Sequence, residues 1–135
     1  MQFADLISQI SPTLSGMGFA LSRVAQYGAV FSKGTYSLHL EGEPHYPDSI
    51  AMSVRDANGA VFELGLLAQL ISPSWYKVNS GRAIGAKSAA QSVMEMLHFI
   101  SDHEEAIFLR TGALEESYEV ASQERMASLG LPKPR

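Results

Sequence analysis

Residues 35–67 read TYSLHLEGEPHYPDSIAMSVRDANGAVFELGLL, and apolar side chains alternate with polar ones along much of this stretch. Successive side chains of a β-strand point to opposite faces, so a period of two predicts strands with one apolar face and one polar face. The pair Asn58-Gly59 tolerates positive φ angles and predicts a two-residue type I′ hairpin turn. The alternating apolar positions are Tyr36, Leu38, Leu40, Ile50, Met52 and Val54.

The same period extends outward and predicts four strands, at 19–27, 30–41, 49–56 and 60–67. Their short connections indicate an antiparallel meander. On the N-terminal side, apolar residues three and four positions apart predict a short helix from Phe3 to Leu14. Gly16 and Gly18 then stop the helix. Because Pro12 lacks a backbone donor, an alternative is that the helix ends near Ile10 and resumes as a short turn at Ser11.

The C-terminal half is predicted to be helical after a long connection. Residues 67–80 include Pro73 and are expected to form a loop longer than the usual length of about 4–6 residues. From 86 to 100, apolar residues follow a helical stripe that further apolar side chains widen nearly all round, so this helix should be central. Helical patterns also cover 102–109 and 114–129. The stripe consists of Ala86, Ala90, Val93, Leu97 and Ile100, widened by Met94, Met96 and Phe99.

These elements predict an α+β fold. An N-terminal helix precedes a four-stranded antiparallel meander, and two to three C-terminal helices pack on one sheet face. We expect a single domain over residues 1–130 and a flexible tail at 131–135. A chain of 135 residues with 46% hydrophobic and 18% charged residues is typical of one soluble globular domain.

Composition excludes several classes of function. The chain has no cysteine, which excludes disulfides, zinc–thiolate sites, iron–sulfur clusters and thiol catalysis. Its formal net charge of −4 argues against a nucleic-acid partner, because phosphate binding needs a basic surface, and favours a basic protein partner. No apolar run approaches the roughly 18 residues of a membrane span, and residues 1–5 lack the basic flank of a signal peptide. We therefore expect a cytoplasmic protein with no membrane partner.

Two patterns approach known ligand sites without completing them. Residues 81–88 read GRAIGAKS and would match a phosphate-binding loop if Ala86 were glycine, but no buried parallel strand is predicted before them. We interpret them as the glycine-punctuated start of a helix. His98 and His103 are five residues apart and would lie on different faces of a helix, so no metal site is expected there. No metal or other cofactor is predicted.

Catalytic motifs are also missing. The sequence has no Gly-x-Ser-x-Gly turn and no nucleophile next to a convincing base, so we expect that the protein is not an enzyme. The meander could still bring His39 close to Glu41 and Glu63. A pocket near His39 and Tyr36 would then make a small-molecule-binding or enzymatic domain the alternative. The same residues are equally typical of an ordinary solvent-exposed sheet face, on which Arg55 and Glu63 would form a cross-strand pair of opposite charge.

Trp75 and Tyr76 are the sharpest binding signal in the sequence. Tryptophan and tyrosine combine a large apolar area with a polar group, and they anchor many protein interfaces. Both follow Pro73 in the predicted loop. The alternative is that Trp75 packs under the loop and closes the core.

In its order of elements, the sequence resembles the small acidic immunity proteins of bacterial toxin–immunity systems. The resemblance rests on a helix followed by Gly18-Phe19, a meander that contains DANGAVFELG at 56–65, a helical last third, small size, acidity and the absence of cysteine. It implies a single α+β domain that binds and blocks one cognate toxin. Size and acidity are also similar to those of the cytosolic chaperones of type III secretion, which are small α/β dimers. The paired strands expected in the second half of such a chaperone are not predicted here.

These observations predict a cytoplasmic protein-binding module, an immunity protein that occludes a basic toxin such as a nuclease. Opposite charges would speed the association and fix its register. A type III secretion-like chaperone and a small-molecule-binding or enzymatic domain are the alternatives. A further alternative is a structural subunit that forms a homodimer through the apolar helix at 86–100. The predicted partner-binding surface combines the polar sheet face with the loop, through His39, Glu41, Arg55, Glu63, Trp75 and Tyr76.

Overall fold

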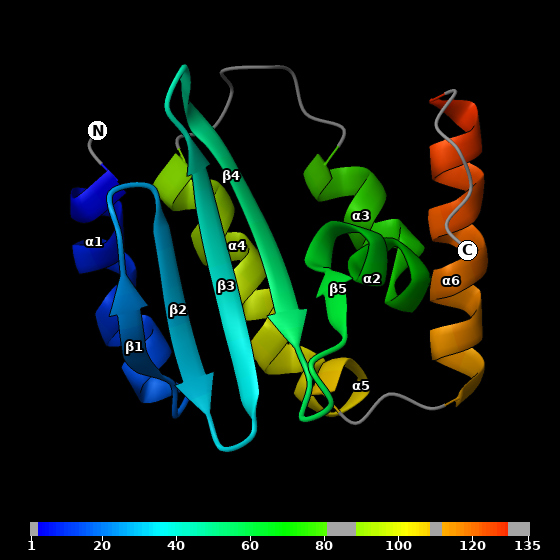
Figure 1. Ribbon diagram of the computed structural model, residues 1–135, viewed down its shortest axis with the longest axis horizontal. Helices are drawn as coiled ribbons and strands as arrows, with labels where there is room; N and C mark the ends of the chain where they lie inside the picture. The colour runs from blue at the N-terminus through cyan, green and yellow to red at the C-terminus, as the bar shows by residue number, and fades with distance from the viewer. Residues whose placement is uncertain (1–2, 81–88, 109–111, 130–135) are drawn as a thin grey trace.

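The computed structural model describes residues 3–80, 89–108 and 112–129 (Figure 1). It confirms the predicted α+β class, with an N-terminal helix, an antiparallel meander and C-terminal helices. The predicted helix start at 81–88 and the predicted tail at 131–135 lie outside the described residues. None of the described helices is long and apolar enough to cross a membrane. In chain order the elements are α1 (Phe3–Gly16), β1 (Ala20–Val24), β2 (Gly28–Lys33), β3 (Tyr36–Glu43), β4 (Tyr46–Arg55), β5 (Val61–Glu63), α2 (Leu64–Ile71), α3 (Pro73–Ser80), α4 (Ala89–Asp102), α5 (Glu104–Phe108) and α6 (Gly112–Ser128).

The described sheet has five strands where four were predicted. Their order is β1-β2-β3-β4-β5, and every neighbouring pair is antiparallel. The prediction of one strand over 30–41 is wrong, because β2 and β3 are separate strands joined at Gly34. Gly34 has a φ of +61°, which glycine adopts without a steric penalty. The buried positions change parity between Phe31 and Leu38, and this change is the sequence signal for the turn.

The connection between β4 and β5 is longer than the predicted two-residue turn. The N–H of Gly59 donates to the carbonyl oxygen of Asp56 at 3.0 Å. Oδ1 of Asp56 also accepts the N–H groups of Asn58 at 2.9 Å and Ala60 at 3.0 Å. Gly59 has a φ of +82° but Asn58 does not have a positive φ, so the predicted type I′ turn is wrong. The aspartate side chain organises this turn in place of a second residue with positive φ.

Residues 67–80, predicted as a loop, form part of α2 and all of α3. Ser72 separates the two helices, and its carbonyl oxygen accepts the N–H of Tyr76 at 3.0 Å. Pro73 is the first residue of α3, where the missing N–H of proline costs no helical hydrogen bond. The loop prediction is therefore wrong, because Ser72-Pro73 starts a helix as well as ending one. β5 is short because α2 begins inside the predicted strand 60–67.

Helix α1 continues through Pro12 to Gly16, as the stop at the glycines predicts, so the alternative of an end near Ile10 is wrong. The side chain of Pro12 is exposed, and the neighbouring Ser11 hydroxyl donates to the carbonyl oxygen of Ile7 at 2.6 Å. The single backbone hydrogen bond that proline removes is outweighed by the burial of one apolar face of the helix. That face consists of Phe3, Leu6, Ile7, Ile10 and Leu14.

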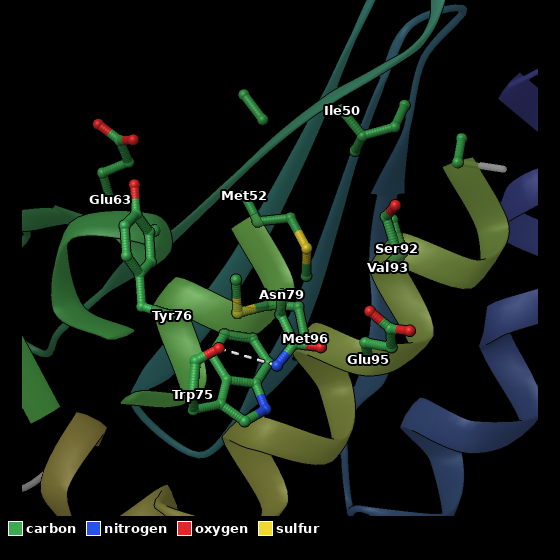
Figure 2. A pocket seen from close by; sticks show the side chains of 13 residues that line it. Ile50, Met52, Glu63, Trp75, Tyr76, Asn79, Ser92, Val93, Glu95 and Met96 are labelled. Atoms are coloured by element: carbon green, nitrogen blue, oxygen red, sulfur yellow. Dashed lines mark hydrogen bonds between the residues drawn. The ribbon is translucent and has the colours of Figure 1, made fainter. Parts of the chain in front are cut away.

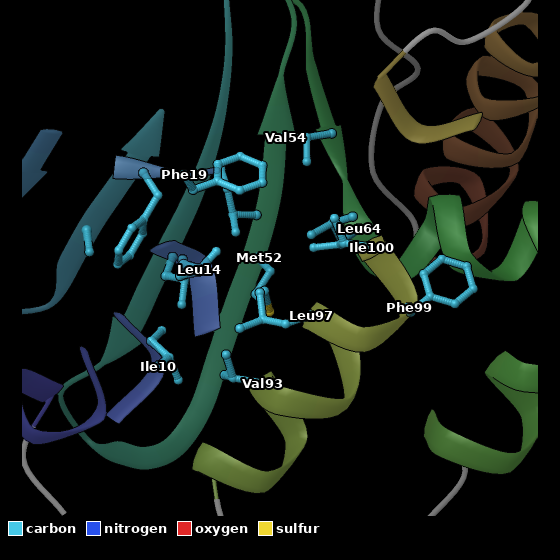
Figure 3. Close-up of a cluster of buried hydrophobic side chains, with 14 of the residues drawn as sticks. Ile10, Leu14, Phe19, Met52, Val54, Leu64, Val93, Leu97, Phe99 and Ile100 are labelled. Carbon is cyan, nitrogen blue, oxygen red and sulfur yellow. The ribbon is translucent and has the colours of Figure 1, made fainter. Parts of the chain in front are cut away.

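The apolar face of the sheet packs against α1, α4 and α5 and encloses the hydrophobic core (Figures 1 and 3). Leu38 and Val54 project into it from neighbouring strands, and Leu97 meets them from α4. The other side of α4 is covered too, because Trp75 of α3 packs on Phe99. Part of the apolar surface that suggested a symmetric dimer is thus covered within the chain, while Ala90, Met94 and Met96 are only partly buried. Dimerisation stays a prediction, which light scattering would test.

Gly18 and Gly16 offer a matched test of the connection between α1 and β1. Gly18 has a φ of +90°, and a Cβ there would lie 3.1 Å from the side chain of Lys33. We expect Gly18→Ala to lower the free energy of unfolding by about 1–2 kcal/mol. Gly16 has open space around it and no positive φ, so Gly16→Ala should leave stability unchanged or raise it by up to ~1 kcal/mol. Urea denaturation measures both, and equal losses would contradict the prediction.

Candidate functional site

The six residues predicted to bind a partner line two hollows that share no described lining residue. The first, which we call the edge hollow, lies between β4, α3 and α4 and is lined by Glu63, Trp75 and Tyr76. The second, which we call the open-face hollow, lies on the sheet face opposite the core and is lined by His39, Glu41 and Arg55. The structure therefore divides the predicted surface into two parts with different surroundings.

The edge hollow has a volume of about 300 Å³ (Figure 2). β5 pairs with β4 only from Ser53 to Arg55. Among the described residues, no strand pairs with this side of β4 from Tyr46 to Met52. The hollow is therefore bounded on one side by an unpaired strand edge and on the others by helices. Its further lining residues are Ile50, Ala51, Met52, Gly65, Asn79, Ala89, Ser92, Val93, Glu95 and Met96.

Trp75 combines the two roles that the sequence left open. Its ring centroid lies 4.4 Å from that of Phe99, so it packs on the core. It is also only half-buried and lines the edge hollow beside Tyr76. Nδ2 of Asn79 donates to the carbonyl oxygen of Trp75 at 2.8 Å, one turn further along α3. The packing on Phe99 thus holds the indole while part of its surface faces the hollow, as an interface anchor requires.

Glu63 is held in place by α6 instead of by Arg55. Its Oε2 accepts a hydrogen bond from Nη1 of Arg125 at 2.7 Å, and its N–H donates to the hydroxyl of Tyr118 at 2.8 Å. The hydrogen bond and the charge of Glu63 raise the pKa of Arg125 above its ordinary value. The predicted cross-strand pair with Arg55 is wrong, because Val61 is the residue opposite Arg55. No local sequence pattern indicates a contact between residues so far apart in the chain.

The open-face hollow has a volume of about 280 Å³ and lies over β1 to β4. Strand register explains how its polar residues meet. Arg23 is opposite Val30, Val30 is opposite His39, and His39 is opposite Ser53. These side chains share the face that no described helix covers, which is turned toward the viewer in Figure 1. Arg23 is a lining residue that the sequence analysis missed, and a register shift between Leu21 and Arg23 hides its place in the strand pattern.

The charge of the open face is mixed, and the acidic surface lies elsewhere. Within the described part of the chain, neither Arg23 nor Arg55 forms an ion pair, and Glu41 lies near them on the same face. Exposed carboxylates are instead concentrated on the C-terminal helices, at Asp102, Glu105, Glu115, Glu116, Glu119 and Glu124. A basic partner would thus be attracted to the helical side of the molecule more than to the open sheet face.

His39 is the titratable group whose properties the open face changes. Nε2 of His39 and the hydroxyl of Ser37 share a hydrogen bond of 2.8 Å. Partial burial, followed by the charge of Arg55, lowers the pKa of His39 from its ordinary value of 6.5; Glu41 opposes this and Arg23 adds to it. The folded state therefore resists protonation of His39, so this residue reduces stability as the pH falls below 6.5.

We expect Arg55→Gln to raise the pKa of His39 toward 6.5, because the substitution removes the largest charge contribution to the lowered value. An NMR titration of the His39 ring measures this pKa directly. Lys77→Gln removes one positive charge at an exposed position of α3 outside both hollows and is the matched control. An unchanged pKa of His39 in the Arg55 variant would contradict the assignment.

The pocket predicted near His39 and Tyr36 is wrong, because the two side chains lie on opposite faces of the sheet. Tyr36 packs on the core side, with its ring centroid 5.0 Å from that of Phe108. His39 faces the open side. The separation of three residues in one strand requires this arrangement.

Among the described residues, no three histidine, aspartate or glutamate side chains lie close enough together to hold a metal ion. No protein-family model, curated protein or solved structure matches the chain.

Proposed function

We propose that the protein is a cytoplasmic binding module that recognises a basic partner protein through the edge hollow. The observation that carries this proposal is the convergence of Trp75, Tyr76 and Glu63 around one hollow beside an unpaired strand edge. The aromatic side chains supply buried contact area, whereas the carboxylate of Glu63 is already paired with Arg125. Charge complementary to a basic partner is therefore supplied by the exposed acidic residues of α6.

The partner class that we propose is a basic toxin, such as a nuclease, whose active surface the protein covers. This agrees with the function implied by the resemblance to small acidic immunity proteins. Steering by opposite charge raises the rate of association, which a protein that must block a toxin quickly would need.

A chaperone function is the second candidate, and the unpaired edge of β4 supports it. A strand edge can pair with an extended segment of another polypeptide, and the neighbouring apolar walls can receive its side chains. The two candidates differ in the partner's state. An immunity protein would bind the folded toxin and abolish its activity, whereas a chaperone would bind an unfolded segment.

Affinity capture from a lysate of the source organism tests the proposal. Tagged protein at low and then moderate salt should retain one basic protein in near-stoichiometric amount, and salt should weaken the retention. The purified partner should lose its activity on addition of the protein. Failure to retain any protein at low salt would overturn the binding proposal. Retention without inhibition would overturn the toxin-blocking part.

Charge reversal on α6 tests the electrostatic part separately. Glu116 and Glu119 are both exposed, so replacing both by lysine should leave the thermal midpoint nearly unchanged. We expect the association rate with the captured partner to fall about tenfold at low salt and much less at high salt. Stopped-flow fluorescence of Trp75 measures the rate. Glu41→Lys, on the open face, is the control and should have a smaller effect.

A further inference from the structure

The open-face hollow contains two positive charges that form no ion pair with any described residue. Arg23 of β1 and Arg55 of β4 line it on either side of His39. Within the described residues neither guanidinium lies within ion-pair distance of a carboxylate. An arginine side chain has five N–H donors and stays charged across the physiological pH range. The hollow therefore presents a set of strong donors that form no ion pair with a described carboxylate, although Glu41 lies on the same face.

We propose that the open-face hollow binds a small organic anion, whose carboxylate or phosphate group accepts hydrogen bonds from Arg23 and Arg55. Planar guanidinium groups bind both kinds of oxyanion with paired hydrogen bonds. This inference is independent of the proposed function, because the two hollows share no described lining residue.

The size and the remaining lining of the hollow favour an organic anion over a simple inorganic ion. Its volume of about 280 Å³ is close to the lower end of small-molecule sites. Val30 provides an apolar surface between the two arginines, and Glu41 provides a carboxylate on the same face. A ligand with one oxyanion and an uncharged or positively charged remainder would match this distribution.

His39 should report on occupancy of the site. The charged groups that act on it are Arg23, Arg55 and Glu41, while the residues directly opposite it on β2 and β4, Val30 and Ser53, carry no charge. A bound anion would offset the positive charge of the arginines, so the pKa of His39 should rise when the site is filled. By linkage, the anion should bind more tightly as the pH falls through the titration range of His39.

NMR titration of the isotopically labelled protein tests the proposal, with citrate as the carboxylate probe and glycerol 3-phosphate as the phosphate probe. Sodium chloride at the same ionic strength is the reference for screening. We expect saturable shifts of the Arg23, His39 and Arg55 signals with at least one probe, and a higher pKa of His39 at saturation. Saturation by citrate or by glycerol 3-phosphate alone would identify which oxyanion the site prefers.

Variants separate a defined site from general attraction to positive charge. Arg23→Gln and Arg55→Gln should each weaken binding about tenfold or more, whereas Lys77→Gln should leave it unchanged. Glu41→Gln should tighten binding, because it removes a negative charge from the hollow. The NMR spectrum of each variant shows whether it remains folded.

Three results would overturn the inference: no saturable shift with either probe, shifts that chloride reproduces, or equal binding by the wild type and both arginine variants. Trp75→Ala should leave anion binding unchanged, because Trp75 lines the other hollow. Loss of partner capture in Trp75→Ala with retained anion binding would therefore support two separate sites. Failure of the wild-type protein to capture any partner, with retained anion binding, would refute the proposed function and leave this inference standing.

Discussion

Replacing Phe99 by alanine is expected to lower the free energy of unfolding by about 3–5 kcal/mol, the range for a fully buried phenylalanine. Phe99 is 1% exposed. Its ring centroid lies 4.4 Å from that of Trp75 on α3 and 4.4 Å from that of His103, which lies between α4 and α5. Figure 3 shows Phe99 on the side of α4 away from Leu97, so its loss would open a space between α4 and α3.

Urea denaturation followed by circular dichroism measures this loss, and the single tryptophan provides a second probe. Trp75 should become more hydrated when Phe99 is removed, so its fluorescence emission should shift to longer wavelength. His98→Ala changes the neighbouring exposed residue of α4 and should cost no more than about 0.5 kcal/mol. A loss below about 1 kcal/mol in Phe99→Ala would contradict the packing described for α3 and α4.

The parts of the fold that the sequence predicts correctly depend on local periodicity. Leu38 and Leu40 alternate with polar residues because one face of β3 packs against the core and the other does not. This alternation can be recognised in the sequence of the strand alone. Val93 and Leu97 likewise repeat at helical spacing because one side of α4 meets the sheet. Neither prediction needs knowledge of a distant residue.

The wrongly predicted elements contain residues that are compatible with two kinds of local structure. Glycine at position 34 fits a strand interior poorly and a turn well, but the continuous run of strand-forming residues around it conceals the turn. Pro73 both ends one helix and begins another, so its presence alone does not distinguish a loop from a helix junction. The change of parity before Leu38 would have resolved the first ambiguity.

The candidate site could be predicted by residue type but not by arrangement. Trp75 and Tyr76 were identified because aromatic side chains near a proline suggest an anchor, and the structure places both on one hollow. The pairing of Glu63 with Arg125 depends on how α6 packs beside α2, which no local pattern encodes. Arg23 could not be predicted as a site residue, because the residues beside it on the neighbouring strands are known only once the strand register is known.

Trp75→Ala is expected to weaken binding of the captured partner by about 30-fold or more, corresponding to about 2 kcal/mol. The indole is half-buried and braced by Phe99, so it is already ordered before binding and loses little further conformational entropy in a complex. Calorimetry with the purified partner measures the affinity. Trp75→Phe keeps an aromatic ring against Phe99 and should lose less than Trp75→Ala.

The stability of α3 must be separated from its role in binding, because Trp75 also contacts the core. Val78→Ala supplies that control: Val78 lies on the same helix, is 63% exposed and does not line the edge hollow. Each variant should be measured well below its own thermal midpoint, so that a reduced affinity cannot arise from unfolding. If Trp75→Ala and Val78→Ala weakened binding equally, the indole would not be the anchor. A loss of affinity in Trp75→Ala but not in Val78→Ala would place the partner over the edge hollow, because Trp75 lines that hollow while its ring packs on Phe99 of the core.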